Sequence, residues 1–224
     1  MATGKKRATR PARTALAPIH NLRVLPLTPS RWPDLEALFG PRGACGGCWC
    51  MVWRLPRAAW TKGKGAGNRR ALRRIVTSGA APGLIAYAGG EPVGWCAVAP
   101  RADYSGLARS RVLAPLDDTP VWSVTCLFVA RAHRRRGVTV ALLKASTEFA
   151  RKNGASVVEG YPVEPWTDEV PAAFAWTGLP SAFLKAGFVE VARRSRTRPI
   201  MRWTSSARPS SKRTQPQPKR AQPR

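Results

Sequence analysis

Hydrophobic positions recur along the middle of the chain with two periods, of two residues in some segments and of about 3.6 residues in others. The first period predicts strands and the second predicts helices. The expected helices cover residues 30–39, 69–78, 138–153 and 180–185. The expected strands cover residues 21–27, 83–87, 92–98, 121–129, 155–161, 188–193 and 199–203. The remaining segments, including residues 61–67 and 102–120, are expected to be loops.

Small polar residues mark several ends of these elements. Asn68 can cap the helix at residues 69–78, and Gly154 can end the helix at residues 138–153. Gly89-Gly90-Glu91 is a hairpin signal between two strands. The resulting order is β-α-α-β-β-β-α-β-α-β-β. It predicts an α+β fold with a mixed, mostly antiparallel sheet of about seven strands and helices on both faces. Residues 121–161 supply its one parallel β-α-β crossover.

A basic turn joins the strand and the helix of that crossover. It reads His133-Arg134-Arg135-Arg136-Gly137-Val138-Thr139. The first N–H groups of a helix have no partner within the helix, and the helix dipole adds positive potential there. The turn is therefore expected to hold phosphate groups. It matches neither GxxxxGK[ST] nor GxGxxG, so the ligand is not predicted to bind in the manner of those motifs.

The turn resembles the acetyl-CoA turn of the GNAT N-acetyltransferase superfamily, written [RQ]xxGx[GA]. Arg134, Gly137 and Thr139 occupy its three marked positions. Thr139 departs from the pattern, because it puts a β-branched side chain where the family usually has glycine or alanine. Three further segments resemble the family too: residues 90–95 as the second hairpin strand, Leu127-x-Val129 before the turn, and Phe183-Leu184-Lys185-Ala186-Gly187-Phe188, which is similar to FYxKxGF. The resemblance covers roughly residues 21–203.

The resemblance implies acetyl-CoA as the co-substrate. Its pyrophosphate would bind the amides of the turn, and its pantetheine would lie beside the strand that precedes the turn. The cofactor-binding residues implied in this way are Leu127, Phe128, Val129, Arg134, Arg135, Arg136, Gly137, Val138 and Thr139. An amine would attack the thioester directly, and a backbone N–H of that strand would polarise the thioester carbonyl.

The family's usual proton-transfer groups are missing from this sequence. No carboxylate stands at Ser123, Thr125 or Cys126, where the family often has its base, and Phe183 stands where a tyrosine acid is frequent. Glu159 and Tyr161 are the best replacements, because they share one face at the end of a strand. Glu159 would be the base and Tyr161 the acid. The alternative is a satisfied ion pair and a pocket wall.

Aromatic residues are candidates for the acceptor pocket. The resemblance places the segment with Trp49, Trp53 and Trp60 near the acceptor side, with core packing as the alternative. Tyr104 lies in the long loop at residues 102–120 and is a candidate substrate contact. Asp103, Asp117 and Asp118 lie in the same loop, where capping of the loop is the alternative role.

Cys45, Cys48 and Cys50 form a C-x2-C-x-C segment. A structural zinc would need a fourth ligand, and neither His20 nor His133 has a suitable spacing, so no metal is predicted. The cysteines could instead supply a reactive thiol, or could pack as small apolar groups beside the tryptophans. The same segment, Cys48 to Met51 in CxxCWCM, resembles one found in GNAT-like proteins, and the likeness implies no role.

The ends of the chain are basic and poor in acids. Residues 1–18 contain five Lys/Arg and residues 204–224 contain six, with no acid in either, so about +15 of the formal +26 belongs to residues 19–203. We expect one acyltransferase domain at residues 19–203 between two disordered tails. The charge would attract polyanions, including nonspecific nucleic acid at the tails. With no apolar run of about 20 residues and no signal peptide, no membrane association and a cytoplasmic location are expected.

Three functions follow from these patterns. The leading prediction is an acetyl-CoA-dependent N-acetyltransferase acting on a small amine or a protein amino group. A non-catalytic GNAT-fold module that binds acyl-CoA or an acidic partner is the first alternative. A basic nucleic-acid-binding protein is the second, weakened because the tryptophans are not interleaved with the basic tracts. Whether the protein is a monomer or a homodimer stays open.

Overall fold

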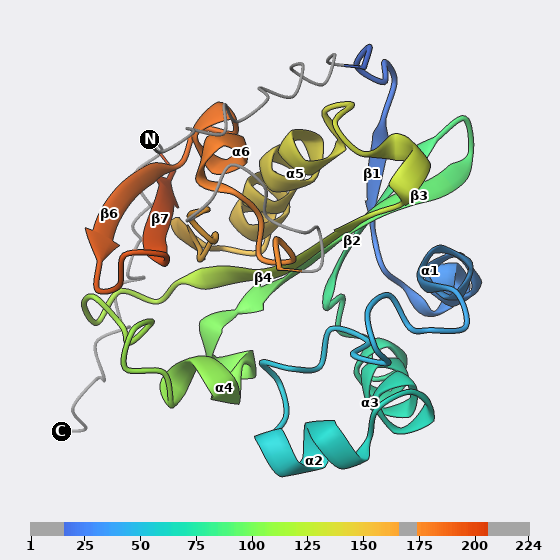
Figure 1. The fold of residues 1–224 in the computed structure, drawn as a ribbon, viewed down its shortest axis with the longest axis horizontal. Coiled ribbons are helices and arrows are strands. Elements are labelled where there is room, and N and C mark those ends of the chain that lie inside the picture. The colour runs from blue at the N-terminus through green and yellow to red at the C-terminus, as the bar shows by residue number, and fades with distance from the viewer. Residues whose placement is uncertain (1–15, 166–173, 206–224) are drawn as a thin grey trace, which may run out of the picture.

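The computed structural model describes residues 16–165 and 174–205 of the 224-residue chain. Within these residues a seven-stranded sheet has the order β1-β2-β3-β4-β5-β7-β6 (Figure 1). The strands are β1 Arg23–Pro26, β2 Gly83–Ala88, β3 Glu91–Pro100, β4 Trp122–Val129, β5 Val157–Gly160, β6 Val189–Arg193 and β7 Pro199–Thr204. The pair β4/β5 is parallel, and the remaining neighbouring pairs are antiparallel. The predicted α+β class and its parallel crossover are confirmed.

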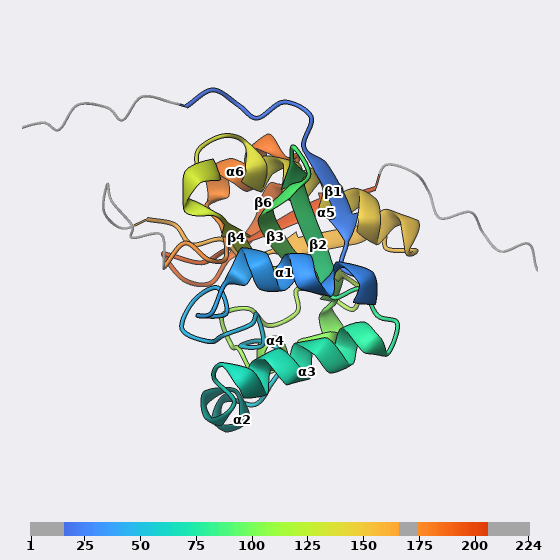
Figure 2. The ribbon, with the colours of Figure 1, turned by 90° about the vertical axis from the view of Figure 1, so that its right-hand side faces the viewer.

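Helices cover both faces of this sheet, as predicted. They are α1 Trp32–Phe39, α2 Arg57–Lys62, α3 Ala66–Thr77, α4 Ser105–Ala108, α5 Val138–Lys152 and α6 Pro180–Lys185. Helices α5 and α6 lie on one face and α1 to α4 on the opposite face (Figures 1 and 2). Successive side chains of β2 point to opposite faces of the sheet and so enter two different hydrophobic clusters. Leu84 packs in the cluster between the sheet and α5, whereas Ile85 packs in the cluster between the sheet and α1 and α3.

Several expectations about local structure were wrong. Helix α2 extends into residues 61–67, and α4 and a 3-10 helix, Arg101–Asp103, lie within residues 102–120. These helices are too short to show a hydrophobic period. Asn68 lies inside α3 and is fully buried, so it is not a cap. Its amide donates to the carbonyls of Gly47 and Trp60, 3.1 and 3.2 Å away, which ties α3 to the segment before it.

The two predicted tails are mostly outside the described residues. Residues 16–18 and Thr204–Ser205 are the described parts, and Thr204 is the last residue of β7, where it pairs with Val157. The carbonyl of Ala17 accepts a hydrogen bond from Arg136 at 3.1 Å, and the amide of Ile19 donates to the carbonyl of Arg136 at 3.1 Å. The chain just before β1 therefore lies against the basic turn.

Candidate functional site

The basic turn precedes α5 in a conformation that exposes backbone amides. After the 3-10 helix Arg131–His133, Arg135 and Gly137 both have positive φ, of 63° and 84°. Gly137 is the N-cap of α5, and no side chain of the described residues caps this helix. The amides of its first turn have no helical carbonyl to bind, since the first helical bond runs from Ala141 to Gly137. Unpaired amides at the start of a helix are a feature of anion sites, which is the role the sequence predicts for this turn.

Two cavities meet at the start of α5. One, of about 220 Å³, is lined by basic side chains and by the turn itself: Val129, His133, Arg135, Gly137, Val138, Thr139, Val140 and Lys185. The second, of about 450 Å³, runs along the end of β4 toward α6, and its lining includes Leu127, Phe128, Val129, Arg134 and Thr139. Because Thr139 and Val129 line both cavities, the basic pocket and the largely apolar groove are neighbours.

Most of the predicted cofactor-binding residues line these two cavities. Arg136 lines neither, because its side chain donates to the carbonyl of Ala17. Arg134 lines the groove, and its Nε donates to the carbonyl of Val129 at 3.0 Å, which holds the turn against β4. The structure therefore brings the strand residues and the turn residues of the prediction together at one place.

The groove opens where β4 and β5 separate. Their parallel pairing covers Trp122–Val124 and Val158–Gly160. On the opposite edge of β4, Ala97 pairs with Cys126 and Val98 with Val124, so a β-bulge lies between these pairs. Beyond it, the amide of Leu127 donates to the carbonyl of Trp176 at 2.7 Å. The segment around Trp176 thus lies against β4 beside the gap, a contact that the sequence pattern did not predict.

Glu159 and Tyr161 lie together, as the period of two predicts. The Tyr161 hydroxyl donates to one Glu159 carboxylate oxygen at 2.8 Å and lies 2.9 Å from the Ser123 hydroxyl. Arg202 Nε donates to the second carboxylate oxygen at 2.8 Å, and Arg101 donates to the Tyr161 oxygen at 2.6 Å. Glu159 is 2% exposed and Tyr161 1%. The pair lies in a buried, charge-balanced network, and its catalytic roles stay a prediction.

Two buried tyrosines determine how the stability of the protein should change at alkaline pH. Burial, followed by the charge of Glu159, raises the pKa of Tyr161, and burial raises the pKa of Tyr104 to about 12. In the unfolded chain a tyrosine ionises near about pH 10. The unfolded state then loses protons that the folded state keeps, so the free energy of unfolding should fall as pH rises from about 10 toward 12.

Urea unfolding at a series of pH values between about 8 and 11 measures this effect. A Tyr161→Phe variant should lose stability less steeply than the wild type over the alkaline part of the series. Equal slopes for the two proteins would contradict the assigned burial of this hydroxyl.

Phe183 occupies the position of the family's frequent tyrosine and is fully buried. A Cβ added to Gly160 would lie 2.0 Å from its ring, and one added to Gly178 would lie 2.8 Å from the ring. The ring also packs edge-on against Phe188, with centroids 5.1 Å apart. Phe183 therefore fixes α6 to the end of β5 and is a packing residue.

Gly160→Ala is expected to lower the free energy of unfolding by about 2 kcal/mol or more, because the new methyl group overlaps the Phe183 ring. Gly67→Ala is the matched control, since Gly67 lies in α3 and has no atom within 4 Å of an added Cβ. There alanine should be neutral or stabilising by up to about 1 kcal/mol. Denaturant unfolding of both variants measures the difference, and equal stabilities would contradict the packing described for Phe183.

The three residues predicted to contact the acceptor lie in three different places. Trp49 is buried and stacks on Trp32, with ring centroids 5.9 Å apart, so it belongs to the core under α1. Trp53 is half-buried, and its ring lies 6.2 Å from that of Trp176, which lines the groove. Tyr104 is 1% exposed. Trp53 is therefore the predicted acceptor residue that reaches a groove wall.

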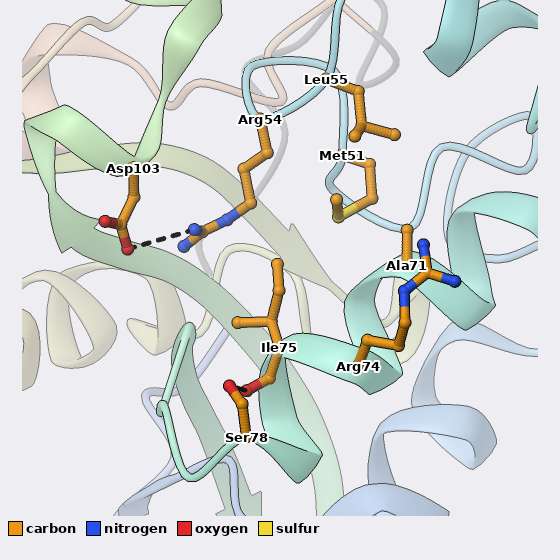
Figure 3. Close-up of a pocket in the computed structure, with 8 residues that line it drawn as sticks. All are labelled: Met51, Arg54, Leu55, Ala71, Arg74, Ile75, Ser78 and Asp103. Atoms are coloured by element: carbon orange, nitrogen blue, oxygen red, sulfur yellow. Dashed lines mark hydrogen bonds and ion pairs between the residues drawn. The ribbon is translucent and has the colours of Figure 1, made fainter.

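Tyr104 lies beneath Arg54, whose guanidinium is 4.4 Å from the centre of its ring. Arg54 also donates to the Tyr104 hydroxyl at 3.3 Å and forms an ion pair with Asp103 at 3.4 Å. Arg54 and Asp103, but not Tyr104, line a cavity of about 370 Å³ between α3 and the segment that precedes α2 (Figure 3). Its lining is completed by Met51, Leu55, Ala71, Arg74, Ile75 and Ser78.

Asp117, another polar candidate of the long loop, has structural partners. Asp117 accepts a hydrogen bond from the amide of Thr119 at 3.0 Å, which is the predicted loop capping, and pairs with Arg202 at 2.6 Å. Among the described residues no group of three or more His, Cys, Asp or Glu side chains could hold a metal ion.

Comparison with known proteins decides the family. The model of the acetyltransferase (GNAT) family matches residues 49–170, more than half of the chain. The chain belongs to the GNAT acetyltransferase family. The matched region contains β2 to β5, the basic turn and α5, so it includes the turn, the end of β4 and Glu159 and Tyr161.

Solved structures with a similar fold are also GNAT proteins. PaiA N-acetyltransferase from Thermoplasma acidophilum, in complex with coenzyme A, is 11% identical over 83% of this chain and all of its own, with a TM-score of 0.48. A GNAT acetyltransferase from Listeria monocytogenes is 8% identical over 82% and 95% of the two chains, with a TM-score of 0.49. The GNAT domain of S. lividans PAT is 17% identical over 82% and 90%, with a TM-score of 0.45. A search of curated proteins found no match.

None of the helices in residues 16–165 and 174–205 is long and apolar enough to cross a membrane.

Proposed function

We propose that the protein is an N-acetyltransferase that moves the acetyl group of acetyl-CoA to an amine of a small molecule or a protein, by direct attack in a ternary complex. The observation that carries this proposal is that the basic pocket and the apolar groove are neighbours and share Val129 and Thr139 in their linings. Phosphates held at the start of α5 would be followed by a groove of suitable polarity for the pantetheine chain. Membership of the acetyltransferase family supports the same chemistry.

The Leu127 amide is the proposed polarising group for the thioester. In the structure this amide donates to the Trp176 carbonyl at 2.7 Å. That carbonyl marks a position where an oxygen can accept the hydrogen bond. The thioester oxygen would take this place when the Trp176 segment shifts, and a fixed N–H there would stabilise the charge that develops on the oxygen.

Glu159 and Tyr161 are the proposed base and acid. The Tyr161 hydroxyl donates to the carboxylate; Glu159 lies on β5 opposite Ser123 of β4, and Tyr161 directly follows β5, where the parallel pairing has ended. Because Glu159 is only 2% exposed, the amine proton would reach it through an entering water or the Tyr161 hydroxyl. Arg101 and Arg202 would hold the carboxylate in place beside the Tyr161 hydroxyl.

Release of CoA thiol over a panel of small amines and lysine-containing peptides tests the proposal, with the acetylated product identified by mass spectrometry. We expect thiol release that requires both acetyl-CoA and an amine. No release with any amine, together with no change in melting temperature at saturating acetyl-CoA, would overturn it.

A non-catalytic module that binds acyl-CoA is the second candidate. It is favoured by one specific observation: both proposed proton-transfer groups are buried in an ion-paired network, and a phenylalanine stands where a tyrosine acid is frequent. A rise in melting temperature with acetyl-CoA, without thiol release, would identify this function.

A further inference from the structure

Two cysteines from distant parts of the sequence meet in the core beneath α1 and α3. The sulfurs of Cys50 and Cys126 are 3.1 Å apart. The two residues are 4% and 8% exposed and belong to one cluster with Trp49, Met51 and Trp95. Seventy-six positions separate them along the chain, so their contact joins the C-x2-C-x-C segment to the central strand of the fold.

The local backbone directs both side chains to this place. Trp49 and Cys50 have positive φ, of 46° and 53°, which are uncommon values for residues other than glycine. On β4, Val124 and Leu127 pack on the α5 face, whereas Cys126 packs on the opposite face because of the bulge between them. The positive-φ turn at Trp49 and Cys50 and the β-bulge of β4 thus place the two thiols in contact.

The surroundings slow the reaction of the Cys50 thiol with reagents from solution. The contact with Cys126, then burial, raises the pKa of Cys50 well above its usual range. Such a thiol is rarely ionised at neutral pH, so exchange with bulky disulfides should be slow. A small neutral oxidant can react with a buried thiol where a bulky one is excluded.

We propose that Cys50 and Cys126 form a reversible disulfide when the protein meets a peroxide. The Cys126 sulfur, in the more exposed of the two residues, attacks one peroxide oxygen. The O–O bond breaks, leaving a sulfenic acid on Cys126 and releasing one water. The Cys50 sulfur then attacks the sulfenic sulfur, the S–O bond breaks, and the hydroxide leaves with the Cys50 proton as a second water. The two thiols lose two electrons, which reduce one peroxide to two waters.

The bond would lie beside the groove of the proposed acetyltransferase. Cys126 directly precedes Leu127, whose amide is the proposed polarising group, and Cys45 of the same segment as Cys50 lines the groove. The disulfide would link the segment of Cys45 and Cys50, which forms this wall of the groove, covalently to β4. The disulfide itself depends on the two sulfurs and not on the proposed function, so a protein without transferase activity would form it equally.

Cys96 is the matched control inside the sheet. It lies on β3, is fully buried and packs on the α5 face, opposite to Cys50 and Cys126. Cys45 and Cys48 are the controls within the segment, since Cys45 is exposed and Cys48 is half-buried. Trypsin cuts after Arg42 and Arg54, which leaves these two cysteines and Cys50 in one peptide. The double variant Cys45→Ser/Cys48→Ser therefore makes the assignment unique.

The test treats the reduced full-length protein with one equivalent of hydrogen peroxide and maps its peptides without reduction. We expect five free thiols to fall to three, and one cross-linked pair joining residues 43–54 to residues 112–131, reversed by dithiothreitol. The pair should persist in Cys45→Ser/Cys48→Ser and in Cys96→Ser, and be absent from Cys126→Ser and Cys50→Ser. A link to the Cys96 peptide, a bond within residues 43–54, or five thiols still free in the oxidised wild type would overturn the proposal.

Discussion

A Glu159→Gln variant should turn over about a hundredfold more slowly than the wild type while remaining folded. Glutamine preserves the size of the side chain but cannot take a proton from the amine. In the variant Arg202 keeps its ion pair with Asp117, and Arg101 keeps its hydrogen bond to the carbonyl of Leu113. Neither guanidinium is therefore left without a partner. The measurement is kcat over a pH series, in which the variant should stay below the wild type at every pH where the wild type is active.

Asp117→Asn is the matched control for this experiment. It alters the second carboxylate bound to Arg202 and removes one charge, yet Asp117 is a loop residue with a side chain 43% exposed. We expect its kcat to stay within about twofold of the wild type. If Glu159→Gln has an unchanged kcat and an unchanged pH profile, the buried network is purely structural and Glu159 is not the base.

Thr139→Glu should weaken acetyl-CoA binding by at least about thirtyfold. Like charges about 4 Å apart near a protein surface repel by about 4 kcal/mol, and half of that repulsion corresponds to thirtyfold in Kd. An acid in the first turn of α5 is favourable for the helix itself. The ligand-free protein should therefore keep its melting temperature while losing the stabilisation by acetyl-CoA, which thermal unfolding and calorimetric titration measure.

Two variants separate charge from bulk in this test. Thr139→Gln adds similar bulk without charge, and Lys144→Gln makes the same change in net charge on an exposed position of α5. Both should bind acetyl-CoA more tightly than Thr139→Glu does. Equal binding by all three variants would show that the start of α5 is not the phosphate site.

The fold was predictable because its strongest signals are local. The apolar runs of β2 and β3, the turn at Gly89-Gly90 and the apolar stripe of α5 each depend on residues close in sequence. The short helices α2 and α4 were missed because four to six residues show no period. Asn68 was misassigned because its partners, the carbonyls of Gly47 and Trp60, lie outside the helix that it was expected to cap.

The site was predictable in part for the same reason. The turn and the placement of Glu159 with Tyr161 follow from local geometry along one strand and one helix start. The partners Arg101 and Arg202 come from a 3-10 helix and a different strand, and a one-dimensional pattern carries no signal for their distance. The Trp176 carbonyl at Leu127 is equally long-range, and tryptophan gives no sequence signal for a backbone contact.

A crystal structure of the protein with acetyl-CoA tests the central claim most directly. We expect the pyrophosphate within hydrogen-bond distance of the backbone amides that follow Gly137. The thioester oxygen should lie on the Leu127 amide in place of the Trp176 carbonyl. Acetyl-CoA bound elsewhere, such as in the cavity beside Arg54, with the turn empty and the Leu127–Trp176 bond intact, would contradict it.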